Sequence, residues 1–278
     1  MMLCRFGEFQ NEKPAIRHQD GSLLDVSAFG EDYNEAFFDS EGPSRLAEWL
    51  KDQNPPRIAE NSRLSAPICR PSKIFCAGLN YADHAAQFNM DLPSEPMFAY
   101  KATSALCGAN DPLVRPQDAQ QLDWEVELAI VIGKRAKNVT ESQASAHIAG
   151  YLAHNDLTER AWPLGEKARW LQAKSHDGFA PMGPFMALGE PPDCQITLAL
   201  NGHVYQRAQT AKLIFAPRAL VAYLSRYMTL LPGDVISTGS PAGVGYGENP
   251  KRFLRPGDTL TWGITGLSTA ETPVVTRH

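Results

Sequence analysis

Proline and glycine interrupt this chain often, which favours short elements joined by turns. The sequence of 278 residues contains 21 glycines and 21 prolines. Proline ends regular elements because it lacks a backbone donor, and glycine because it adopts turn conformations readily. The pattern predicts short strands that are joined by many turns, with only a few helices.

Local signals place several of these elements. An Asp-Gly pair at 20–21 and an Asn-Gly pair at 201–202 each lie between apolar stretches, which is typical of β-hairpins. Pro217 precedes apolar residues at helical spacing and predicts a helix start. Residues 140–143 (Thr-Glu-Ser-Gln) match a capping box, and we expect a helix from there to about Gly150. Strand–helix alternation is too weak for a doubly wound sheet.

Composition narrows the class of protein. Hydrophobic residues make up 43% and charged residues 21%, which is ordinary for a globular chain. The formal net charge of −5 opposes a dedicated nucleic-acid binder, and no apolar run approaches the roughly 20 residues of a membrane helix. The first residues lack an apolar signal segment, and the five cysteines are scattered without a CxxC pair. We therefore expect a cytoplasmic protein with reduced thiols, no membrane anchor and no nucleic-acid partner.

A stretch rich in proline and serine divides the chain. It covers residues 54–73 and reads as a linker. We predict a small N-terminal domain over residues 1–65 and a main domain over residues 66–278.

The most informative strand in the main domain is residues 122–133, LDWEVELAIVIG. Glu125 and Glu127 are two residues apart, so a strand places them on the same face. Two carboxylates that face inward would repel one another unless a divalent cation lay between them. Asp156 follows the next apolar stretch and is a natural third oxygen ligand, and hard Mg²⁺ or Mn²⁺ suits such a set better than zinc. The alternative is a solvent-facing strand edge with two ordinary glutamates.

Other candidate residues carry weaker signals. His84 and Lys174 lie in segments rich in polar residues or glycine, yet a lone histidine is more often structural and a lone lysine is usually on the surface. The glycine-rich segment GSPAGVGYG fits neither GxxxxGK[ST] nor GxGxxG, so nucleotide binding there is disfavoured. Neither GxSxG nor HExxH occurs, which leaves serine-hydrolase and zincin functions without support.

Several stretches together resemble the fumarylacetoacetate hydrolase family, and they follow one another in that family's order. They are GLNYADHAAQ, SEPMFAYKATSALCG, DWEVELAIVIGK, NDLTERA, KSHDGFAPMGP, NGHVYQ and LLPGDVISTGSPAGVG. The resemblance runs from about Lys73 to the end of the sequence, and residues 1–65 resemble the small leading domain of many members. The form of the first motif is most similar to the branch that acts on 2,4-diketo-3-deoxy sugar acids.

The resemblance implies an α+β fold, mostly β, with a mixed β-roll or sandwich core, a small N-terminal α/β appendage and a homodimer. It implies that Glu125, Glu127 and Asp156 hold Mg²⁺ or Mn²⁺. It also implies roles for residues around that ion. Those expected to take part in catalysis are His84, Lys174 and Gln87, and those expected to contact the oxo-acid substrate are Tyr81, Lys101, Thr238 and Gly239.

One departure from the family pattern leaves the reaction open. Hydrolytic members typically carry H-x-x-E, in which a His–Glu dyad activates water, whereas this chain has His84 and Gln87. Glutamine can orient a water but cannot accept its proton. Leu79 also replaces an arginine that members often carry, which removes a cationic contact to the distal part of the substrate.

Three functions follow, and product analysis separates them. The first is hydrolytic C–C cleavage of a 2,4-dioxo acid to pyruvate and a second carboxylic acid. The second keeps the metal and the enolate chemistry without water, as in a decarboxylase, isomerase or dehydratase acting on a small 2-oxo acid. The third is metal-dependent binding without turnover, which the intact acidic triad and Lys174 oppose.

Overall fold

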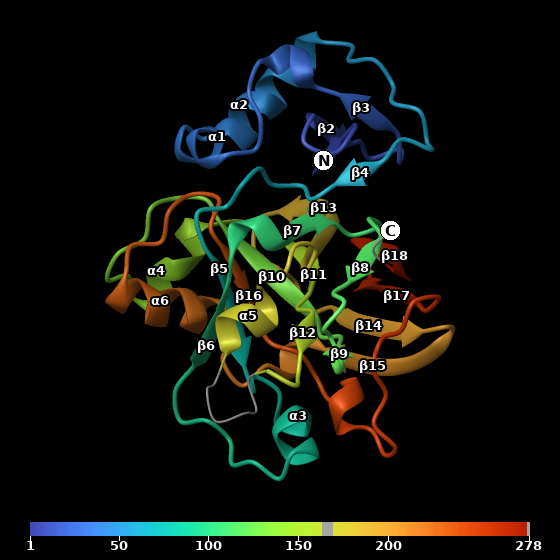
Figure 1. Cartoon of the computed structure of the whole chain (residues 1–278). Coiled ribbons are helices and arrows are strands. Elements are labelled where there is room, and N and C mark those ends of the chain that lie inside the picture. The colour runs from blue at the N-terminus through green and yellow to red at the C-terminus, as the bar shows by residue number, and fades with distance from the viewer. Residues whose placement is uncertain (163–168, 277–278) are drawn as a thin grey trace.

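The computed structural model describes residues 1–162 and 169–276 and consists mainly of sheet (Figure 1). An 11-stranded sheet has the order β3-β2-β1-β13-β11-β10-β16-β5-β6, with β4 beside β1 and β7 beside β13. Its strands are β1 (Met2–Phe6), β2 (Lys13–Arg17), β3 (Leu23–Asp25), β4 (Leu64–Ser65), β5 (Ile74–Gly78), β6 (Met97–Lys101), β7 (Leu106–Gly108), β10 (Val126–Ile132), β11 (Ile148–Asn155), β13 (Ala180–Leu188) and β16 (Val235–Ser237).

A second sheet of five strands has the order β15-β14-β17-β18-β8. Its strands are β8 (Leu113–Arg115), β14 (Gln195–Leu200), β15 (His203–Gln209), β17 (Thr259–Ile264) and β18 (Ser268–Thr276). Val126 and Leu128 of β10 belong to the same buried hydrophobic cluster as Leu198, Leu260 and Trp262 of this sheet. The packing of two sheets around that core confirms the predicted α+β, mostly-β fold class.

Short elements complete the fold. Strands β9 (Leu122–Asp123) and β12 (Thr158–Glu159) pair with each other. The helices are α1 (Glu35–Asp39), α2 (Gly42–Trp49), α3 (Ala82–Gln87), α4 (Glu141–Ala144), α5 (Trp170–Lys174) and α6 (Pro217–Tyr227). None of the helices in the described part of the chain is long and apolar enough to cross a membrane.

The N-terminal strands extend the larger sheet. Strand β1 pairs antiparallel with β13, so β1, β2 and β3 continue its edge, and α1 and α2 lie at the same end of the molecule (Figure 1). The boundary predicted at residue 65 coincides with β4, which pairs with β1. The expected linker therefore contains a strand.

The predicted turns and the predicted helix start are confirmed. Strands β2 and β3 form a hairpin around 20–21, and β14 and β15 form one around 201–202. Asn201 has φ 51° and Gly202 has φ 82°, as a type I′ turn requires. Helix α6 begins at Pro217 as expected.

Two expectations about element length were wrong. The helix predicted to reach Gly150 ends at Ala144 and a short 3₁₀ turn follows, although its capping box forms. From Ile148 the chain pairs with β10 instead, and this long-range ladder overrides the local helix signal. The strand predicted over 122–133 is interrupted between β9 and β10, where the Glu125 N–H donates to the side chain of Asn155 at 2.9 Å.

Candidate metal centre

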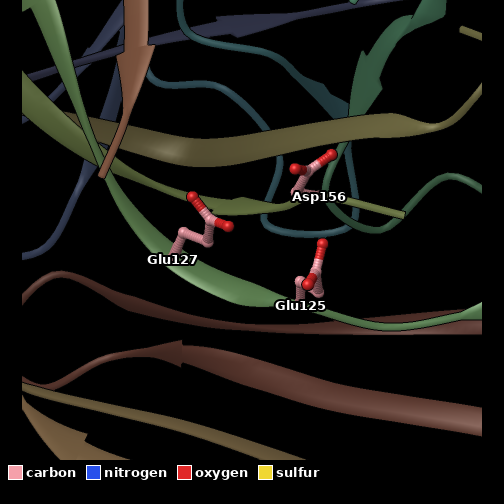
Figure 2. A group of neighbouring side chains, drawn as sticks. All are labelled: Glu125, Glu127 and Asp156. Carbon is pink, nitrogen blue, oxygen red and sulfur yellow. The ribbon is translucent and has the colours of Figure 1, made fainter. Parts of the chain in front are cut away.

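Three carboxylates meet beside the central strands of the larger sheet. Glu127 lies in β10 and Glu125 directly precedes it, while Asp156 follows β11, the antiparallel neighbour of β10. The Asp156 N–H donates to the Glu125 carbonyl at 2.8 Å, which holds the two chain segments side by side. All three side chains are buried, and each offers an oxygen within 4.8 Å of the others (Figure 2).

Lys174 contacts two of these carboxylates. It is the last residue of α5, and its Nζ donates to Glu125 Oε2 at 3.1 Å, to Thr158 Oγ1 at 3.0 Å and to Asp156 Oδ2. The structure thus places this lysine next to the acidic cluster.

Lys101 approaches the cluster from β6 and is fully buried. Its Nζ forms an ion pair with Asp156 Oδ1 at 2.8 Å and donates to the carbonyls of Leu157 at 2.9 Å and Lys174 at 2.7 Å. These three contacts direct the ammonium group at backbone and carboxylate oxygens of the protein itself.

Arg160 completes the cationic side of the cluster. Its guanidinium lies 2.8 Å from Glu125 Oε1 and 3.0 Å from Asp123 Oδ2, and Asp123 Oδ1 accepts the Gly245 N–H at 2.7 Å. Sequence reasoning did not single out Arg160 or Asp123. The signal was available for Arg160, which lies in the NDLTERA stretch four residues after Asp156.

The three carboxylates differ in their electrostatics. Burial would raise the pKa of Glu125, but the charges of Arg160 and Lys174 outweigh it and lower that pKa. Burial is likewise outweighed at Asp156, where two lysine charges lower the pKa. Burial and then the negative charges of Asp156 and Glu125 raise the pKa of Glu127 well above its usual value. Glu127 therefore experiences the repulsion that a cation would relieve.

Glu127 is held by hydrogen bonds. Its Oε2 accepts from Ser237 Oγ at 2.6 Å and from the Gly239 N–H at 2.7 Å. Gly239 has φ +101°, a conformation that favours glycine. The neighbouring Thr238 Oγ1 donates to the Leu128 carbonyl at 2.9 Å, so this hydroxyl is directed at β10.

Helix α3 carries the other predicted residues and contacts a glycine-rich loop, residues 240–247. Gln87 Oε1 accepts the Gly243 N–H at 3.2 Å, and Asp83 Oδ1 accepts the Ala242 N–H at 3.4 Å. A Cβ on Gly247 would lie 2.1 Å from Gln87 Nε2. Gln87 is thus packed against this loop.

Tyr81, directly before α3, and His84, within α3, are both buried. Within the described part of the chain, neither His84 Nδ1 nor the Tyr81 hydroxyl has a hydrogen-bond partner. Burial lowers the pKa of His84, and the negative charge of Glu125 partly opposes that shift. His84 is therefore neutral near pH 7 and lies within electrostatic reach of the carboxylates.

Comparison with known proteins identifies the family. The family model "Fumarylacetoacetate (FAA) hydrolase C-terminal" matches residues 73–275. The chain belongs to the fumarylacetoacetate hydrolase family. A Burkholderia ambifaria relative, named provisionally as a hydrolase, is 41% identical over 96% of both chains.

Solved structures of fumarylacetoacetate hydrolase family members share the whole fold. The fumarylacetoacetate hydrolase of Exiguobacterium antarcticum is 32% identical with a TM-score of 0.86, covering 100% of both chains. A 5-carboxymethyl-2-hydroxymuconate delta-isomerase from Mycobacterium smegmatis is 31% identical with a TM-score of 0.79, at the same coverage. Maleylpyruvate hydrolase from Sphingobium sp. SYK-6, solved with manganese(II) and pyruvate, is 26% identical with a TM-score of 0.82, also covering 100% of both chains.

The donor set in this family member fits a divalent cation. Its three adjacent donors are carboxylate oxygens, which are the ligands that Mg²⁺ and Mn²⁺ prefer. Burial, followed by the negative charges of Asp156 and Glu125, raises the pKa of Glu127, and a cation would offset that negative charge. The residues present can therefore hold such an ion.

Proposed function

We propose that this protein is a divalent-metal-dependent hydrolase that cleaves a C–C bond in a 2,4-dioxo acid to give pyruvate and a second carboxylic acid. Glu125, Glu127 and Asp156 would hold Mg²⁺ or Mn²⁺. The manganese and pyruvate in the Sphingobium relative support both the metal and the product.

The buried charge balance is the observation that carries this proposal. Four carboxylates lie in the cluster, and three cations form ion pairs with three of them, all except Glu127, among the described residues. The carboxylates are Asp123, Glu125, Glu127 and Asp156, and the cations are Lys101, Arg160 and Lys174. With all four carboxylates ionised, a divalent ion would change the formal net charge from −1 to +1, and a positive buried site attracts an anionic oxo acid.

The chemistry divides between the metal and the residues around it. A bound divalent cation supplies Lewis acidity to a chelated 2-oxo carboxylate. Neutral His84 would take a proton from water as the water oxygen attacks the distal carbonyl carbon. The bond between that carbon and the adjacent methylene then breaks, and its electron pair forms the enolate of pyruvate. His84 would return the proton to the methylene carbon of this enolate, which gives pyruvate. Lys174 would place positive charge beside the developing enolate oxygen.

A second function uses the same centre without attack by water. Gln87 is hydrogen-bonded to Gly243, and it supplies no carboxylate to support a histidine base. An isomerase is also among the structural relatives. Decarboxylation, isomerisation or dehydration of a small 2-oxo acid is therefore the alternative that these two observations favour.

The deciding experiment is a substrate screen with product identification. The protein would be stripped with EDTA, reloaded with Mg²⁺ or Mn²⁺ and offered 2,4-dioxo acids and oxaloacetate. Equal amounts of pyruvate and a second acid would support hydrolysis. Carbon dioxide or an isomer as the only product would support the alternative, and no turnover of any substrate would contradict both.

We also propose a homodimer with one such site in each subunit. The family resemblance supports this proposal. Sedimentation velocity at micromolar concentration checks it, and a monomer as the only species would contradict it.

A further inference from the structure

A buried histidine outside the acidic triad contacts the centre through a serine. His154 lies in β11 and is fully buried, and its cross-strand partner in β10 is Glu127. Its Nδ1 lies 2.7 Å from Ser237 Oγ, and the Ser237 hydroxyl lies 2.6 Å from Glu127 Oε2. Three neighbouring strands, β11, β16 and β10, thus contribute one side chain each to a continuous chain of hydrogen bonds.

Proton accounting gives this chain a direction. A serine hydroxyl has one proton, and Glu127 as an ionised metal ligand can only accept it. The contact with His154 must then be accepted by the hydroxyl, so His154 Nδ1 carries the donated proton. His154 therefore donates to Ser237, and Ser237 donates to Glu127.

The hydrogen bonds to Glu127 select one of its two oxygens. Both of the donors identified in the structure, Ser237 Oγ and the Gly239 N–H, end on Oε2. Across the described ranges, 1–162 and 169–276, no ion pair to Glu127 is found, whereas Glu125 and Asp156 each have two or more. Glu127 is therefore oriented by hydrogen bonds alone, and Oε1 is left for a metal ion.

The two partners use their polar atoms on side chains and not on the backbone. Thr238, the next residue, satisfies its buried hydroxyl on the backbone carbonyl of Leu128, whereas Ser237 uses its hydroxyl on a carboxylate. His154 Nε2 has no partner among the described residues, and an unpaired buried nitrogen costs free energy. The bond to Ser237 is the contact that accounts for an imidazole at this position.

We propose that His154 and Ser237 are a positioning pair that fixes Glu127 as a one-oxygen ligand of the divalent cation. The proposal rests on the proposed metal site and assigns two further residues to it. Partners that orient a metal ligand typically change metal affinity by 10- to 100-fold when they are removed. The pair should therefore act on metal binding as well as on turnover.

The test measures Mn²⁺ affinity by calorimetry on protein stripped with EDTA. Ser237→Ala should raise the Kd by about 10- to 100-fold, and His154→Leu should raise it in the same direction. His154→Asn, whose amide can donate from the place of Nδ1, and Ser237→Thr, which keeps the hydroxyl, should recover most of the affinity. Ser225→Ala is the matched control, because Ser225 is buried in α6 and donates to the Ala222 carbonyl at 2.9 Å. Its Kd should equal that of the unchanged protein.

A double-mutant cycle decides whether His154 acts through Ser237. In the Ser237→Ala background, His154→Leu should change the Kd by less than about twofold. The proposal would be overturned if His154→Leu and Ser237→Ala each left the Kd unchanged. It would also be overturned if their effects on the Kd simply added in the double variant. A lower melting temperature of both variants would not rescue it. Should His154→Leu fail to fold, unchanged affinity in Ser237→Ala alone would overturn it. Failure of the unchanged protein to bind Mn²⁺ would instead reject the metal site itself.

Discussion

Two regions of the molecule supply the proposed site, and different kinds of contact hold their side chains in place. The carboxylate centre is built on the adjacent central strands β10 and β11, and ion pairs of 2.8 to 3.1 Å hold Glu125 and Asp156. Helix α3, which carries His84, is attached to the 240–247 loop by side-chain hydrogen bonds of 3.2 and 3.4 Å, near the long limit for such bonds. Figure 1 shows α3 at the end of the molecule opposite the N-terminal strands.

Buried side chains link the two regions, among them Asp123, which accepts the Gly245 N–H at 2.7 Å, and Gln206. Gln206 of β15 accepts the Val126 N–H at 2.9 Å, between the two glutamates of the centre. Its amide group donates to Ser240 Oγ at 2.7 Å and to the Pro241 carbonyl at 2.9 Å, in the loop that α3 contacts. The loop is therefore fixed to the centre. Buried Asn80, just before α3, also donates to the Thr238 carbonyl at 2.7 Å, whereas Asp83 and Gln87 hold the rest of α3 to the loop more weakly. We expect changes in the centre to affect metal binding and changes in α3 to affect the rate alone.

Removal of a metal ligand should have the largest effect. Glu127→Ala leaves two carboxylate ligands, which are too few to hold the ion. The Kd for Mn²⁺ should therefore rise by more than about 100-fold, the most that is typical when only a partner of a ligand is removed. Activity should be lost. Calorimetry and a pyruvate assay measure the two effects. Glu271→Ala, at an exposed position in β18, is the control and should match the unchanged protein.

Chelation tests the same centre without mutation. EDTA should abolish the activity of the unchanged protein, and Mg²⁺ or Mn²⁺ should restore it. Full activity after thorough chelation would contradict the metal assignment.

His84→Ala should separate the two regions most clearly. Loss of a positioned base should lower kcat for hydrolysis by about 10²- to 10⁴-fold. The Kd for Mn²⁺ should stay within about twofold, because His84 contributes no ligand. Decarboxylation of oxaloacetate, if the protein catalyses it, should remain largely intact. An equal loss of metal affinity would show that α3 and the centre act as one unit.

The pH profile of the unchanged protein gives a second view of His84. Burial lowers its pKa below the usual 6.5, so the neutral, proton-accepting form persists at and above that pH. Hydrolysis should therefore be constant as pH falls to about 6.5 and decline only at lower pH. A decline that begins above pH 7 would contradict a neutral, buried base.

Lys174→Met should destabilise the centre when no metal is bound. The substitution removes the ammonium group beside Glu125 and Asp156 and leaves buried negative charge, which typically costs about 3–5 kcal/mol of unfolding free energy. Added Mn²⁺ would replace part of the lost positive charge. Thermal unfolding with and without Mn²⁺ should therefore show a larger metal-induced rise in Tm for the variant. If the variant lost the same amount of Tm with and without Mn²⁺, Lys174 would not be needed to balance the charge of these carboxylates.

The parts of the fold and site that were predictable depend on neighbours in sequence. Alternation in the Glu-Val-Glu segment places Glu125 and Glu127 on one face, and the Asn-Gly pair at 201–202 sets a tight hairpin. The structure brings Asp156 to the same point because β11 pairs antiparallel with β10. Local pattern sufficed for the two glutamates and the hairpin, whereas Asp156 joins them through the pairing of β10 with β11.

Other parts depend on pairings that no local pattern contains. Ser237 reaches Glu127 only because β16 adds to the far side of β10, 110 residues later in the chain. The helix expected up to Gly150 ended early because the ladder with β10 begins at Ile148. The same pairing gives His154 its place opposite Glu127, and a lone histidine in an apolar strand carries no sequence signal for that role.

The smallest effect is expected for Gln87→Glu, although this substitution recreates the His–Glu pair typical of hydrolytic family members. Residue 87 accepts the Gly243 N–H, and a carboxylate accepts such a bond at least as well as an amide oxygen. The new side chain should therefore stay against the loop, and kcat for hydrolysis should change by less than about threefold. The measurement is the ratio of 2,4-dioxo acid hydrolysis to oxaloacetate decarboxylation in the unchanged protein, Gln87→Glu and His84→Ala. A selective rise in hydrolysis of about tenfold, a barrier lower by about 1.4 kcal/mol, would show that the weak attachment of α3 lets residue 87 leave the loop and support His84.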